Sequence, residues 1–125
     1  MDTIAAYLII ATLIILGFFQ ILLALGKPYG RFAWGGQHVV LPRRLRIGSA
    51  LSVLLYALIA YIALGQSGLV ESALADQTLQ TFSWVLFAYF ALGVLMNGVS
   101  RSKQERFTMV PTSALLAASF LILAL

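Results

Sequence analysis

Four long stretches of the chain carry no charged side chain. They cover residues 3–26, 47–70, 77–100 and 107–125, and all twelve Lys, Arg, Asp and Glu residues lie outside them. A helix rises about 1.5 Å per residue, so about 20 residues cross the roughly 30 Å hydrocarbon core of a bilayer. Each stretch is long enough to span a membrane. The pattern predicts an all-α polytopic membrane protein: one domain over residues 1–125, with four transmembrane helices in two hairpins.

The composition agrees with this architecture. Of the 125 residues, 62% are hydrophobic and 10% are charged, whereas a soluble domain is about 45–50% apolar and about 25% charged. A soluble chain of this length cannot bury so many apolar side chains, which excludes a soluble enzyme or a disordered segment. Residues 3–26 are expected to be a retained span, because only Met1 and Asp2 precede them and a signal peptide begins with a basic segment.

The basic residues predict an orientation. With four spans, the connections 27–46 and 101–106 lie on the same side, and together they hold all eight Lys and Arg residues. The other side holds Asp2, Glu71 and Asp76. Short loops rich in Lys and Arg stay in the cytoplasm, so both termini are expected outside. Basic loops lying against a membrane suit anionic lipids and make nucleic acid an unexpected partner.

The long inner connection is predicted to be an ordered basic loop. Residues 26–49 include Gly26, Gly30, Gly35 and Gly36, two prolines, and the aromatic residues Tyr29, Phe32 and Trp34. Glycine and proline fix turns, and a loop this long between helices is usually functional or disordered. Its apolar and aromatic content favours order, with the loop folded against the cytoplasmic mouth of the bundle.

Polar residues near the inner ends of the spans predict a pocket beneath this loop. Gln20 and Asn97 lie at comparable depths, and Ser49 and Ser52 begin the second span nearby. Polar side chains within a membrane need partners or a wet cavity. The candidate ligand-binding residues are Gln20, Trp34, His38, Arg46, Asn97 and Arg101. Glu105 is expected to form a structural ion pair that joins the two inner segments, with Arg46, Arg101 or Arg106 as its partner.

The chain carries no recognisable catalytic or cofactor motif. It has no Cys and one His, which excludes a disulfide and the usual zinc sites, so neither a metal nor a cofactor is expected. His38 as a proton carrier and Glu105 as a general base are the alternatives left for chemistry at the inner mouth.

Several short phrases carry a resemblance. They are Pro28-Tyr29-Gly30, Ala33-Trp34-Gly35-Gly36, Leu41-Pro42, Leu45-Arg46 with Ser49, then Asn97, Ser100-Arg101-Ser102, Glu105-Arg106 and Pro111. These segments resemble those of a family of small bacterial four-span integral membrane proteins of uncharacterised function. The resemblance implies the architecture and a bacterial inner membrane, and it implies no chemistry.

Three functions remain open at this point. The favoured hypothesis is a lipid- or ligand-binding or accessory protein with a polar site at the cytoplasmic mouth. The second is a small-solute transporter or channel, acting as a homo-oligomer. No Asp or Glu falls inside a predicted span, which counts against proton-coupled export. The third is a membrane-embedded enzyme acting on a lipid head group.

Overall fold

A computed structural model describes residues 1–125 as four long helices. These are α1 (Asp2–Ala24), α2 (Arg43–Gln66), α3 (Asp76–Gly98) and α4 (Lys103–Ala124), and two short 3-10 helices, η1 (Gly30–Phe32) and η2 (Trp34–Gly36), lie between α1 and α2. Each long helix is long and apolar enough to cross a membrane. The predicted fold class is confirmed: the chain is an all-helical, multi-pass membrane protein.

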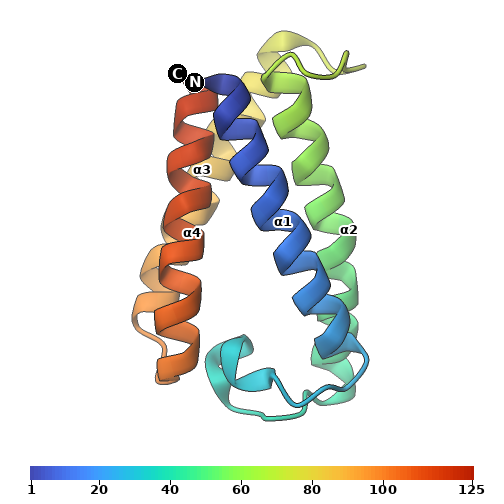
Figure 1. The fold of residues 1–125 in the computed structure, drawn as a ribbon, viewed down its shortest axis with the longest axis vertical. Coiled ribbons are helices and arrows are strands. Elements are labelled where there is room, and N and C mark those ends of the chain that lie inside the picture. The colour runs from blue at the N-terminus through green and yellow to red at the C-terminus, as the bar shows by residue number, and fades with distance from the viewer.

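The helices run alternately up and down, so that connections and termini gather at two ends (Figure 1). Helix α1 packs on α2 and α3 packs on α4, as the two predicted hairpins. Both termini and the connection between α2 and α3 lie at one end, here called the acidic end, which holds Asp2, Glu71 and Asp76. The opposite, basic end holds η1, η2 and all eight Lys and Arg residues.

Helices α2 and α4 begin four residues earlier than the predicted spans at 47 and 107. Pro42 is extended (φ −66°, ψ 162°) and precedes the first turn of α2. Ser102 caps α4, where its hydroxyl accepts a hydrogen bond from the N–H of Glu105. The predicted limits stopped at the charged residues. Each helix instead begins about one turn before its apolar stretch, and this first turn contains charged side chains. Glu105 therefore belongs to α4.

The main hydrophobic core lies in the acidic half of the bundle. Its twelve buried residues come from all four long helices: Ala5, Ile9, Leu13, Ile59, Ile62, Ala63, Leu86, Phe90, Leu116, Ala117, Phe120 and Leu123. The Phe90 and Phe120 rings stack with centroids 5.9 Å apart. The side-chain amides of Gln66 and Gln80 donate hydrogen bonds to the last carbonyls of α4, on Leu123 and Ala124. The shared core and the Gln66 bond join the two hairpins, while the Gln80 bond and the ring stack lie within the α3–α4 hairpin.

In the basic half the hairpins diverge, and the segment with η1 and η2 lies across the opening between them (Figure 1). This segment has a small core of its own, in which Leu23, Ala33 and Leu41 are buried and Phe19 packs against them. The predicted order of the inner loop is confirmed. The loop closes the basic end of the bundle, where the hairpins diverge.

Candidate functional site

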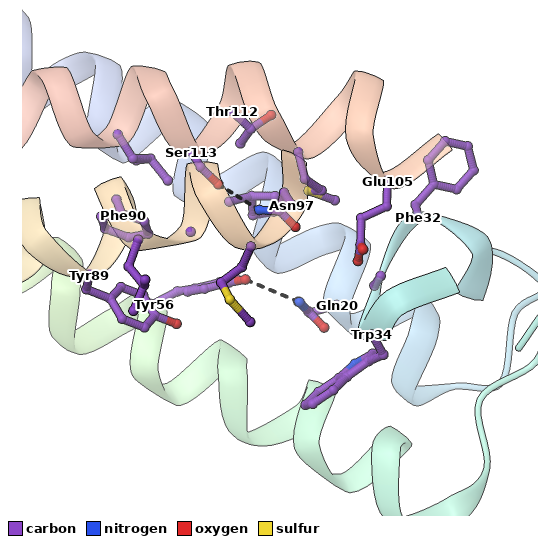
Figure 2. A pocket seen from close by; sticks show the side chains of 17 residues that line it. Gln20, Phe32, Trp34, Tyr56, Tyr89, Phe90, Asn97, Glu105, Thr112 and Ser113 are labelled. Atoms are coloured by element: carbon purple, nitrogen blue, oxygen red, sulfur yellow. Dashed lines mark hydrogen bonds between the residues drawn. The ribbon is translucent and has the colours of Figure 1, made fainter. Parts of the chain in front are cut away.

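A pocket of about 340 Å³ lies between the two hairpins, above the inner loop. All four long helices and the loop contribute to it, and most of its lining is apolar or aromatic (Figure 2). The lining residues are Leu16, Gln20, Phe32, Ala33, Trp34, Tyr56, Tyr89, Phe90, Leu92, Gly93, Met96, Asn97, Glu105, Met109, Thr112, Ser113 and Leu116. The volume falls at the small end of the range of ligand sites, about 300–1,000 Å³.

Three of the six predicted binding residues meet in this pocket. Gln20 on α1, Asn97 on α3 and Trp34 in the loop line it together. Figure 2 shows the side chains of Gln20 and Asn97 directed into the space between the hairpins. The sequence predicted similar depths for these two amides, and in the structure both line the same pocket.

The two amide side chains of the pocket each donate a hydrogen bond within their own hairpin. Gln20 Nε2 donates to the Tyr56 hydroxyl at 3.2 Å, within the α1–α2 hairpin. Asn97 Nδ2 donates to Ser113 Oγ at 3.0 Å, within the α3–α4 hairpin. Gln20 Oε1 is buried and has no hydrogen-bond partner. The amide donors are thus partly engaged, while an acceptor oxygen is left free at the pocket.

Trp34 is held in place by α2. Its indole Nε1 donates to the fully buried Ser49 Oγ at 3.1 Å. Its ring lies against Gly48, where an added Cβ would come within 2.9 Å of ring atoms. Trp34 has a positive φ of 53°, a backbone region that costs a non-glycine residue about 1–2 kcal/mol. Such local strain persists where the surroundings hold it, often at functional sites.

Glu105 is the charged residue of the pocket lining. Ser102 and Glu105 have the spacing of a capping box, in which the Glu side chain returns to the N–H of the capping residue. Here that N–H donates to Ser100 Oγ, and Glu105 Oε2 accepts a hydrogen bond from the N–H of Gly35 at 3.2 Å. The side chain is 6% exposed. It therefore joins α4 to the loop and places a carboxylate beside Gln20 and Asn97 (Figure 2).

The residues of the expected ion pair bond to the backbone. Arg46 Nε donates to the carbonyl of Ala24 at 3.0 Å, and Arg106 Nη1 donates to the carbonyl of Ser100 at 2.6 Å. None of these contacts is the predicted ion pair with Glu105. The last carbonyls of a helix lack partners within it, and Arg46 supplies a donor at the end of α1.

The other predicted residues lie outside the pocket. Arg101 lines a separate, wholly polar pocket of about 790 Å³ at the basic end, formed by Arg31, Gly35, Gly36, Gln37, Arg101, Ser102, Lys103 and Gln104. His38 is half-buried in the loop, and its backbone carbonyl lies against Gly30. The sequence grouped these residues because they lie in the connections 27–46 and 101–106 on the same side, but neither side chain lines the pocket between the hairpins.

Sequence reasoning missed Tyr56 and Ser113, the partners of the two amides. Each is a hydroxyl within an apolar stretch, and a hydroxyl in such a place needs a hydrogen-bond partner. That signal was available in the sequence. The roles of Met96 and Met109 carried no signal, because apolar residues are common on every face of these helices.

An apolar groove of about 590 Å³ adjoins the pocket between α1 and α4. Leu16, Phe32, Met109 and Thr112 line both spaces. The remaining groove residues are Thr12, Ile15, Phe19, Leu22, Tyr29, Thr108 and Leu115. The pocket that contains Gln20, Asn97 and Glu105 therefore shares a wall with an apolar groove on the flank of the bundle.

These features define a class: a four-helix, multi-pass membrane protein with a pocket between its hairpins. Comparison with protein-family models, curated proteins and solved structures finds no match for this chain. The resemblance to small bacterial four-span proteins stays a prediction, and the function must be argued from the pocket.

Proposed function

We propose that the protein binds an amphipathic, lipid-like molecule, whose polar group enters the pocket and whose chain lies in the adjoining groove. The observation that carries the proposal is the shared wall of Leu16, Phe32 and Met109 between a pocket that contains polar side chains and an apolar groove. An amphipathic molecule likewise has a polar group joined directly to an apolar chain. The molecule would come from the surrounding membrane.

The polar half of the pocket supports this proposal. Gln20 Oε1 is buried without a partner, and leaving a buried acceptor unsatisfied costs about 1–3 kcal/mol. A ligand that donates a hydrogen bond to this atom recovers that free energy. The apolar lining and the groove supply dispersion contacts for a hydrocarbon chain.

Native mass spectrometry tests the proposal. Protein released from native membranes should retain a lipid-like molecule. Met109→Trp fills the boundary between pocket and groove and should remove it. Leu58→Trp is the matched control, because Leu58 is exposed on α2 and lies outside both spaces. A wild-type protein without a bound amphiphile, or equal retention by the two variants, contradicts the proposal.

We also propose that the basic end faces the cytoplasm of a bacterium, with both termini outside its inner membrane. The eight Lys and Arg residues at one end support this orientation through the positive-inside rule. A reporter enzyme active only outside the cytoplasm, fused after Leu125, should be active. Activity of a cytoplasmic reporter at that position would reverse the orientation.

Transport of the bound molecule is the second candidate. The apolar stretches hold no carboxylate, but Glu105 in the first turn of α4 lines the pocket and supplies one there. The packed core in the acidic half would have to open for a solute to pass. Liposomes containing the oriented protein should then pass an amphiphile faster than empty liposomes, and equal rates exclude transport.

A further inference from the structure

We infer that the polar group bound in the pocket is a cationic nitrogen, as in a primary alkylammonium, with Glu105 as its counter-ion. This inference rests on the proposed function and names its ligand class. It follows from the hydrogen-bonding groups, the charge and the aromatic surface of the pocket.

Gln20 and Glu105 place acceptor oxygens in the pocket. The Trp34 N–H is donated to Ser49, and the Thr112 hydroxyl to the carbonyl of Thr108. The Gln20 and Asn97 amide groups each donate one hydrogen bond within their own hairpin. Gln20 Oε1 has no partner, and the carboxylate of Glu105 has only acceptor oxygens. A ligand ammonium group can donate hydrogen bonds to these oxygens of Gln20 and Glu105, whereas a carboxylate or phosphate cannot.

The charge of the pocket lining also favours a positively charged ligand group. Glu105 is the charged side chain of the pocket, and it is almost fully buried. A buried charge is stabilised by a partner of opposite sign, while a second anion beside it is strongly unfavourable. The N–H of Gly35 gives Glu105 one hydrogen bond, but no cationic side chain lines the same space.

The basic residues of this end face a different space. Arg31, Arg101 and Lys103 line the separate polar pocket, which Gly35 and Gly36 also border. Trp34, the first residue of η2, lines the pocket between the hairpins. The η2 segment thus stands between the cationic side chains and Glu105. A cation approaching through the groove between α1 and α4 avoids the basic surface.

Aromatic side chains complete the site. Phe32, Trp34, Tyr56, Tyr89 and Phe90 contribute to the lining. The faces of aromatic rings attract cations. The carboxylate of Glu105, the unpartnered oxygen of Gln20 and several rings together select an ammonium group, and the apolar groove selects its alkyl chain.

Three probes of equal chain length test the inference: octylammonium, octanoate and octanol. The protein carries Trp84→Phe, which leaves Trp34 as the single tryptophan, and is placed in phosphatidylcholine nanodiscs, with empty nanodiscs as the partition control. Trp34 fluorescence should respond saturably to octylammonium, at a concentration at least tenfold lower than for the other probes. Glu105→Gln should remove this preference, because glutamine still accepts from Gly35 but has no charge. Glu71→Gln, at the acidic end, should leave it intact.

The outcomes separate the inference from the proposed function. A saturable response that is equal for the three probes or strongest for octanoate overturns the cationic ligand and leaves amphiphile binding standing. No saturable response to any probe overturns both. The comparison of probes on the protein with native Glu105 decides the matter even if Glu105→Gln does not fold.

Discussion

Trp34, Gly35 and Gly36 all have positive φ, in a row, at the place where the loop meets α4. The two glycines adopt this backbone region at low cost, but their surroundings differ. A Cβ on Gly36 would overlap the side chain of Ser102, whereas a Cβ on Gly35 would meet only the flexible Gln37 side chain at 4.0 Å. Of these two glycines, only Gly36 is needed for a close approach to its neighbour.

Gly36→Ala should destabilise the protein more than Gly35→Ala. Both variants bear the cost of a left-handed alanine, about 1–2 kcal/mol, and Gly36→Ala adds a clash that costs about 1–3 kcal/mol more. Unfolding by dodecyl sulfate in mixed micelles, followed by tryptophan fluorescence, measures the difference. Equal losses would mean that the loop does not pack on Ser102 as the structure has it.

At the scale of elements, the first turn of α4 fastens the inner loop. Ser102 accepts a hydrogen bond from the N–H of Glu105 and donates one to the carbonyl of Arg31. Glu105 accepts one from Gly35. The same residues that cap a helix thus hold η1 and η2 beneath the pocket, so the capping of α4 and the order of the loop are coupled.

Ser102→Ala should loosen the loop as well as the end of α4. Loss of a capping hydroxyl costs about 0.5–2 kcal/mol, and the Arg31 carbonyl loses its donor. Hydrogen exchange followed by mass spectrometry should show faster exchange in peptides covering residues 30–36. Thr81→Ala is the control, since the exposed Thr81 hydroxyl bonds only within its own helix. Unchanged exchange in the loop would disprove the coupling.

At the scale of the molecule, the bundle has a packed half and an open half. The core unites both hairpins in the acidic half, and the inner loop and the pocket occupy the basic half. Within a membrane, helices associate through packing and polar contacts because lipid is itself apolar. The stability of the assembly is thus concentrated away from the site.

Phe120→Ala should destabilise the bundle far more than Phe107→Ala. Phe120 is fully buried and Phe107 is 75% exposed. Removing a buried ring forfeits dispersion contacts and leaves a cavity, by about 2 kcal/mol or more, while an exposed ring on a lipid-facing surface costs a few tenths. Unfolding in mixed micelles compares the two. A similar loss for both would place the stabilising contacts outside the acidic half.

The sequence predicted the fold well because one membrane dimension and the distribution of charge constrain it tightly. It also placed Gln20 and Asn97 together, because depth in a membrane follows from residue number. It did not predict the partners of Arg46 and Glu105. Those depend on turns in the loop, which are set by positive φ at Trp34 and its neighbours and by carbonyls left free at helix ends. Neither is visible in a pattern of charges.

The contact between Gly35 and Glu105 joins residues that are 70 positions apart. A ribosome adds about 5–20 residues per second, so roughly 4–14 s pass between the synthesis of one and of the other. During that time α1 and α2 can already lie in the membrane, while the loop between them still lacks its contacts with α4. The pocket is therefore a late product of biogenesis: it can form only after the fourth helix has been made.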